Sequence, residues 1–330
     1  MPPFEKTEGA SRVRAQRGLS PRVATSLKRG FPLLVSLAIL AWLVGQVDLQ
    51  QLLSVLSPRL AGLMVAALLV YGAATLLLEA LSLRMLIPGD VPGFGAWTAA
   101  RIKCASYLLS ILHYALGMGA LAVLLRRRTP LSLAEAGSMV LLISVVDLVV
   151  VVSIIAIGSA FLQGIAPALP LPAVAAILLG FPTGLWLLRT PRSLGPLEAL
   201  RSLRIFAALR EASLLKLAQL FGLRVLFVGC FATLCSVTFP RFGVQAPLAD
   251  VVVGTLVVGF VAGLPIAVAG LGTSQAAFLF LFRDYASQEA LLAQSLVLSA
   301  GILALRGGMG VGFASEFTRE ALAASREEPA

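Results

Sequence analysis

Apolar stretches long enough to cross a lipid bilayer recur through this chain from Phe31 to Phe313. A run of about 18 or more apolar residues is typical of a membrane-spanning helix. Only 13% of the residues are charged, whereas soluble globular domains carry about 25%, so the composition agrees with the runs. The runs are too continuous for barrel strands, which alternate with period two over about ten residues. The sequence therefore predicts an all-α polytopic membrane protein.

The predicted organisation is a single membrane domain over residues 31–313 with a polar segment at each end. Residues 1–30 are polar and rich in arginine, which is typical of a disordered tail. Residues 314–330 form a short polar tail. No hydrophilic stretch inside the domain is long enough for a soluble domain, so we expect none there.

Six apolar runs are predicted to cross the membrane fully: about Phe31–Val47, Leu60–Ile87, Leu131–Phe161, Leu171–Leu188, Leu217–Phe239 and Ala290–Phe313. The third of these runs begins with Ser132 and Glu135, which have the spacing of a capping box. Between the runs lie two segments of a different kind, Val91–Leu125 and Pro247–Phe282, whose apolar pattern is interrupted by glycine.

The interruptions predict broken helices. The first segment contains Gly117-Met118-Gly119, and the second contains Gly263-Leu264-Pro265 and then Gly270-Leu271-Gly272. Glycine permits positive φ and close backbone approach, and proline removes a backbone donor. The two Gly-x-Gly elements lie 153 positions apart, from 117 to 270. This spacing favours an internal duplication with halves of about 31–161 and 171–313.

Basic residues select a topology. The N-terminal tail, Arg126–Arg128 and the link Arg189–Lys216 are all basic, and such regions favour the cytoplasmic side. If Val91–Leu125 crossed the membrane once, the number of crossings before Arg126–Arg128 and before Arg189–Lys216 would be odd, and both regions would lie outside. If that segment dips in and returns, both clusters stay with the N-terminus. Each half then has three crossings, so we expect two inverted repeats with two re-entrant segments, or up to eight segments if these are counted as spanning.

The second interrupted segment also resembles a known family. Gly263-Leu264-Pro265, the stretch 269–275 (Ala-Gly-Leu-Gly-Thr-Ser-Gln) and the later Arg306 are similar to the second-half signature of the lysylphosphatidylglycerol synthase transmembrane-region family, also called flippase-like membrane proteins. The first-half counterpart is Leu109–Leu125 followed by Asp147, and the resemblance covers essentially the whole membrane domain. It implies a lipid-translocating or lipid-binding role in a bacterial inner membrane.

The chain departs from this family in two places. Members often carry an Asn and a Pro-x-x-x-Gly-Glu-like element in the first half, which is absent here, and an acid after the second glycines, where this chain has Gln275. No soluble aminoacyl-transferase domain follows the membrane domain, so the resemblance does not extend to lipid aminoacylation.

We expect the substrate site at the two breaks, because the backbone N–H groups at the start of a half-helix can bind an anion. The candidate binding residues are Gly117, Gly119, Gly270, Gly272, Pro265, Gln275, Arg101, Lys103 and His113. Arg101 and Lys103 could meet a lipid phosphate or could extend to the interface. His113 could relay protons or be a hydrogen-bonded core residue.

Four ionisable residues fall inside predicted spans, where charge is costly and often functional. Glu79 and Arg224 occupy corresponding helices of the two halves, as do Asp147 and Arg306. We predict that Asp147 lies near Arg306, or Glu79 near Arg224, in the protein interior. A purely structural role for such ion pairs is the alternative to a functional one.

The predicted function is lipid translocation or lipid binding. The sequence has no Walker loop, no GxSxG motif and no metal-ligand cluster, so we expect no cofactor, no metal and no catalysis. The net charge of +10 does not indicate nucleic acid, because the basic residues collect at helix ends and suit anionic lipid headgroups. The alternatives are an intramembrane lipid-modifying enzyme using Asp147 or Glu79 as acid and base, and a membrane scaffold. A partner membrane protein or a second copy of the chain is an open choice.

Overall fold

The computed structural model describes residues 57–87, 91–112, 114–162, 171–192, 195, 198–263 and 272–327. These ranges contain helices, turns and bends and no strand. Four helices are long and apolar enough to cross a membrane: α3 (Pro58–Leu86), α6 (Leu133–Gly158, extended by η1, Ser159–Phe161), α10 (Leu214–Thr238, extended by η4, Phe239–Phe242) and the part of α13 (Gln288–Glu327) up to Phe313. The chain is thus an all-α polytopic membrane protein. The predicted crossing Phe31–Val47 lies outside the described residues.

Serines start three of these helices at the edge of the apolar runs. The Ser132 hydroxyl accepts a hydrogen bond from the Glu135 N–H at 3.3 Å, and the Glu135 carboxylate accepts one from the Ser132 N–H at 2.8 Å, which confirms the predicted capping box. Ser57 and Ser213 cap α3 and α10 in the same way, each accepting from a backbone N–H three residues later. Each cap satisfies a backbone donor that a helix start leaves free.

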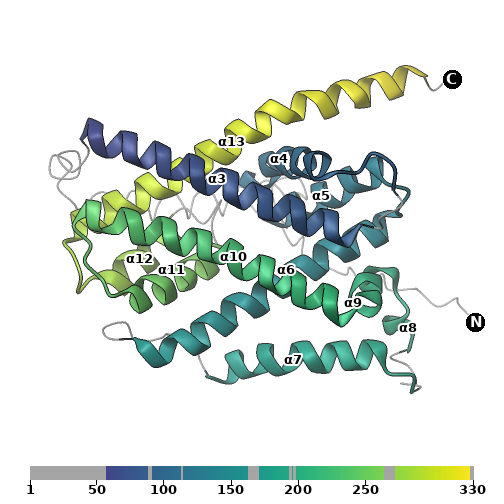
Figure 1. Ribbon diagram of the computed structural model, residues 1–330, viewed down its shortest axis with the longest axis horizontal. Coiled ribbons are helices and arrows are strands. Elements are labelled where there is room, and N and C mark those ends of the chain that lie inside the picture. Colours follow the sequence, from purple (N-terminus) through teal and green to yellow (C-terminus); the bar gives the residue numbers. More distant parts are fainter. Residues whose placement is uncertain are drawn as a thin grey trace, which may run out of the picture.

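The first interrupted segment forms a helical hairpin. α4 (Ala96–Leu112) and α5 (Tyr114–Arg128) pack against each other, and the hairpin begins and ends at the end of the molecule where α3 stops and α6 starts (Figure 1). The segment therefore dips into the bundle and returns.

The predicted position of the first break is wrong. The helix α5 runs through Gly117 and Gly119, and the helices of the hairpin instead end at Leu112 and begin at Tyr114. Gly117 instead allows α5 to pack closely against α4. A Cβ at this position would lie 1.8 Å from the Ser110 hydroxyl and 2.8 Å from the Ser110 Cα. Glycine is needed there for the close approach of the two arms of the hairpin.

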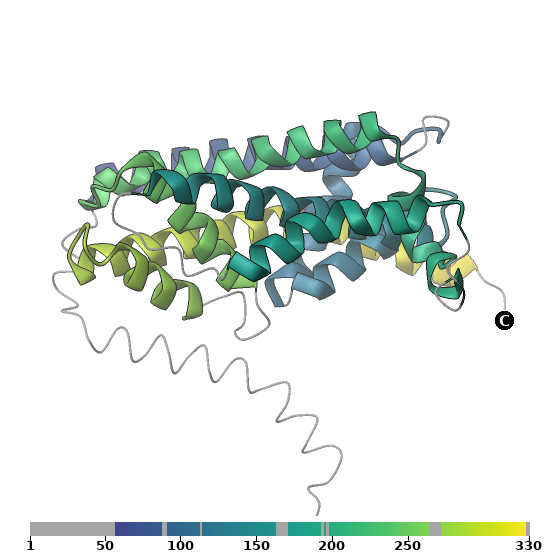
Figure 2. The same cartoon turned by 90° about the horizontal axis from the view of Figure 1, so that it is seen from below.

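The second interrupted segment forms α11 (Leu248–Gly263) and α12 (Thr273–Phe282), which also pack on each other. α11 ends at Gly263, where the sequence predicts a break, and Gly272 has a φ of +88° immediately before α12. Leu264, Pro265 and Gly270 lie outside the described residues. Two perpendicular views place α11 and α12 at the end of the molecule opposite to α4 and α5 (Figures 1 and 2).

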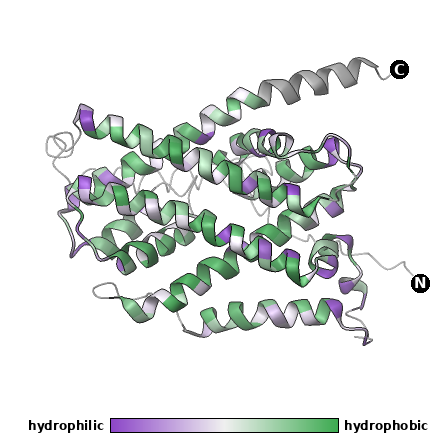
Figure 3. Cartoon of the chain, in the orientation of Figure 1, coloured by the Kyte–Doolittle hydropathy of each residue, from purple (hydrophilic) through white to green (hydrophobic). Residues whose placement is uncertain are grey.

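Hydrophilic residues gather toward the ends of the helices (Figure 3). At the end that holds the α4–α5 hairpin, α7 (Leu171–Arg189) is joined to α10 by α8 (Glu198–Arg201), η3 (Arg204–Phe206) and α9 (Ala207–Glu211). Arginine side chains stabilise this link through hydrogen bonds to backbone carbonyls. Arg189 donates to the carbonyls of Leu209 at 2.8 Å and Ala212 at 2.6 Å, and Arg210 donates to the carbonyl of Arg201 at 2.7 Å. The basic link and Arg126–Arg128 therefore lie at one end.

The long helices cross around a shared core. α10 packs against α3, α6 and α11, and α13 packs against α3, α4 and α12. Small residues sit where α13 crosses its neighbours, because a Cβ on Gly301 would lie 2.3 Å from the Leu68 side chain and one on Gly310 would lie 2.7 Å from Leu108. Such close crossings are how membrane helices gain packing contacts when lipid offers no hydrophobic driving force between them. The helix α13 continues beyond the predicted boundary at Phe313 as far as Glu327.

Candidate functional site

A cavity of about 660 Å³ lies between the two hairpins. The α4–α5 hairpin contributes Tyr107, Ser110 and Tyr114 to its wall, and the α11–α12 hairpin contributes Phe260, Gly263 and Ser274. Residues of α6, α10 and α13 complete the wall, so seven helices from both halves of the chain line the cavity.

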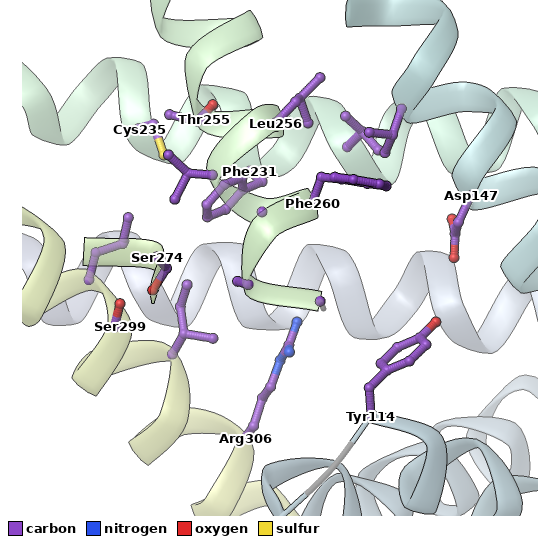
Figure 4. A pocket seen from close by; sticks show the side chains of 18 of the residues that line it. Tyr114, Asp147, Phe231, Cys235, Thr255, Leu256, Phe260, Ser274, Ser299 and Arg306 are labelled. Carbon is purple, nitrogen blue, oxygen red and sulfur yellow. The ribbon is translucent and has the colours of Figure 1, made fainter. Parts of the chain in front are cut away.

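The wall is mostly apolar, with a few polar groups at separate places (Figure 4). Arg306 extends from α13 into the cavity, Asp147 faces it from α6, and the Tyr114 side chain points toward Asp147 from α5 (Figure 4). Ser274 and Ser299 lie near the second hairpin. An apolar pocket with a few convergent polar groups is the usual form of a small-molecule site.

A chain of alternating charges borders the cavity. Nη1 of Arg224, which is fully buried, lies 3.3 Å from the Asp147 carboxylate and 3.6 Å from the Glu79 carboxylate. The Lys103 ammonium lies 3.0 Å from the same Glu79 oxygen. Glu79 and Arg224 are therefore neighbours, as one of the two predicted pairings requires. Because each charge has an opposite neighbour, the cluster can remain ionised in a medium of low dielectric.

Arg306 interacts electrostatically with Glu79 of this cluster but forms no ion pair with a described carboxylate. The other predicted pairing, Asp147 with Arg306, is not formed, because Asp147 pairs with Arg224. The Arg306 guanidinium instead lies over the ring of Tyr107, at 5.5 Å from the centroid, and interacts electrostatically with the Tyr71 side chain. Within the described ranges, no carboxylate oxygen lies within 4.0 Å of it.

Comparison with known families decides the membership of the chain. The family model described as "Lysylphosphatidylglycerol synthase TM region" matches residues 31–304. The chain belongs to this family. No curated protein and no solved structure matches it. Membership makes the chain a membrane protein linked to lipid metabolism or transport.

The family signature and the cavity coincide only in part. Gln275 is fully buried, where its side-chain oxygen accepts the Gly272 N–H at 2.6 Å and its amide donates to the Ser299 hydroxyl at 3.1 Å. Gln275 thereby holds the start of α12 against α13. Lys103 is engaged with Glu79. Gly117, Gly119 and Arg101 are not among the described cavity residues, and His113 lies outside the described residues, as do Pro265 and Gly270.

Sequence reasoning missed the aromatic and hydroxyl residues of the first hairpin. Tyr107 and Ser110 are three positions apart, which is the spacing of one face of a helix, and Tyr114 is the first residue of the next helix. They also lie in an otherwise apolar segment. This polar face, rather than the Gly-x-Gly element, is the sequence signal for the wall of the cavity.

Proposed function

We propose that this protein binds a membrane lipid in the cavity between its two hairpins and moves the lipid across a bacterial inner membrane. The observation that carries the proposal is that hairpins from opposite ends of the molecule contribute to one cavity. Broken segments that come from opposite sides and meet at a shared site are a recurring plan in transporters, in which each side is opened in turn.

The size and chemistry of the cavity support this reading. A volume of about 660 Å³ falls in the range of small-molecule pockets, so it suits a lipid headgroup with the adjoining part of the lipid. The polar groups of Arg306, Asp147 and Tyr114 replace contacts that a headgroup loses when it leaves water. Without such partners, a polar group in hydrocarbon is strongly disfavoured.

Translocation further requires two states that bind lipid differently. A lipid shifts an equilibrium between states only through a difference in its affinity for them. Each hairpin borders the cavity and reaches one end of the molecule, so a displacement of either one would open the cavity toward its own side. In this scheme the end with the basic link is cytoplasmic and the N-terminus lies on the same side.

A cavity-filling substitution tests the proposal. Gly259 lines the cavity from α11, and a Cβ there meets nothing within 4 Å, so Gly259→Phe places a ring in the cavity without a backbone clash. Gly229 on α10 is equally open but is not among the cavity residues, so Gly229→Phe is the matched control. Both variants would be reconstituted in liposomes with fluorescent phospholipids of several headgroups, and transfer would be followed by chemical quenching in the outer leaflet.

We expect the native protein to transfer at least one of these lipids faster than protein-free liposomes. Gly259→Phe should reduce that transfer to the protein-free rate, and Gly229→Phe should not. Transfer by Gly259→Phe at the native rate would show that the lipid takes another path, and no transfer of any lipid by the native protein would refute the proposal.

A further inference from the structure

The charges around the cavity do not balance. Lys103, Glu79, Arg224 and Asp147 form one connected chain of two cations and two carboxylates, so that chain is neutral when all four are ionised. Arg306 adds a third cation. Within the described part of the molecule, its electrostatic partners are the phenols of Tyr71 and Tyr107, which are neutral, and the Glu79 carboxylate, which Lys103 and Arg224 already contact.

The position of Arg306 makes this excess charge significant. It lies within the membrane-length part of α13, and its side chain extends into the cavity (Figure 4). A cation over an aromatic ring gains some stabilisation, but its charge is not neutralised. Three cations here share two carboxylates, and ionisable residues inside a membrane domain are costly and mark ligand or ion pathways.

Resting on the lipid-binding function proposed above, we infer that Arg306 is the anion-binding group of the cavity and that the lipid carries a phosphate, which Arg306 contacts. The planar guanidinium can donate two parallel hydrogen bonds to phosphate oxygens. Tyr71 of α3 and Tyr107 of α4 lie beside the guanidinium. Asp147 does not cancel this site, because its carboxylate is already paired with Arg224.

The inference replaces Lys103 as the phosphate ligand expected from the sequence. The Lys103 ammonium is bound to Glu79, and it lies 5.9 Å from the centroid of the Tyr107 ring. The same ring contacts Arg306. Of the two cations near this ring, only Arg306 lines the cavity, so the phosphate is expected at Arg306.

Binding measurements on the full chain in detergent micelles test the assignment. The probes are dioctanoyl phosphatidylglycerol, dioctanoylglycerol, which lacks the phosphate, and inorganic phosphate, each titrated by calorimetry. We expect the native protein to bind the phospholipid at least about tenfold more tightly than dioctanoylglycerol, since hydrogen bonds to charged groups contribute on that scale. Arg306→Gln should lose most of this preference, and Arg306→Lys, which keeps the cation, should retain more of it.

Arg241→Gln is the matched control, because Arg241 is an exposed arginine in η4 and is not a described cavity residue. It should leave the preference unchanged. An unchanged preference in Arg306→Gln would overturn the inference while lipid binding itself stands. Inorganic phosphate that binds as tightly as the phospholipid would assign the site to a free anion instead. Failure of both lipids to bind the native protein would overturn the proposed function as well.

Discussion

At the scale of single residues, Arg224 organises the interior. It is fully buried on α10 and lies between Asp147 of α6 and Glu79 of α3, while Lys103 of α4 contacts Glu79 from the other side. Four helices are thus joined by one ion chain. Removing charges from water is costly. These four residues can remain ionised because each one lies beside a residue of opposite charge. Replacing one of the four by an uncharged residue should therefore lower the free energy of unfolding by more than one lost contact, because another charge is left buried without a partner.

A double-substitution cycle measures this coupling. Arg224→Met leaves two carboxylates facing one lysine, and breaking a buried ion pair costs about 3–5 kcal/mol. Arg224→Met combined with Asp147→Asn restores the balance, because Lys103 and Glu79 remain as one pair. We expect the double variant to be less destabilised than the sum of the two single variants, measured by thermal unfolding in detergent. Additive losses would contradict a coupled network.

At the scale of elements, the α4–α5 hairpin depends on one glycine. Gly117→Val should open the hairpin, because its Cβ would meet the Ser110 backbone and no rotamer change can relieve that clash. Overpacking of this kind costs about 1–3 kcal/mol. Gly119→Val is the control on the same helix, since a Cβ at Gly119 meets nothing within 4 Å. Unfolding temperatures should fall clearly more for Gly117→Val, and equal losses would show that the approach at Ser110 is not required.

The same glycines show what the sequence can predict of these elements. The long apolar runs predict α3, α6, α10 and the first part of α13 within a few residues, because lipid demands continuous apolar helices and serines cap three of their starts. The end of α4 at Leu112 and the start of α5 at Tyr114 are not predicted. A Gly-x-Gly element permits both a turn and a close crossing, and its composition does not distinguish between them.

The candidate site is predicted less well than the fold. Charge alone identifies Glu79, Asp147, Arg224 and Arg306 as special, since each stands in an apolar helix. Which cation meets which carboxylate depends on how the helices cross and on the direction of each side chain around its axis. Asp147 and Arg306 occupy equivalent positions in the two halves, and this equivalence predicts that they pair. The packing of the helices instead places Arg224 beside both acids.

At the scale of the whole molecule, the two hairpins and the basic residues define a direction. The α4–α5 hairpin lies at one end with Arg126–Arg128 and the link from Arg189 to α10, and the α11–α12 hairpin lies at the other end. Basic residues close to spans favour the cytoplasmic side. The end with the basic link should therefore face the cytoplasm, and an α4–α5 hairpin that returns to the side where it starts leaves both basic regions together.

Labelling from each side of the membrane tests this orientation. Arg127→Cys and Ser202→Cys introduce exposed thiols at the basic end, and Asp284→Cys introduces one at the opposite end, with Cys104, Cys230 and Cys235 replaced by alanine. In spheroplasts, an impermeant thiol reagent should modify Asp284→Cys directly and the other two only after permeabilisation. Because the α4–α5 hairpin returns to the side it came from, Arg127→Cys and Ser202→Cys must behave alike. Labelling of these two positions from opposite faces would require α4 and α5 to form a crossing, and the cavity would then lose the opposed hairpins on which the proposed transport depends.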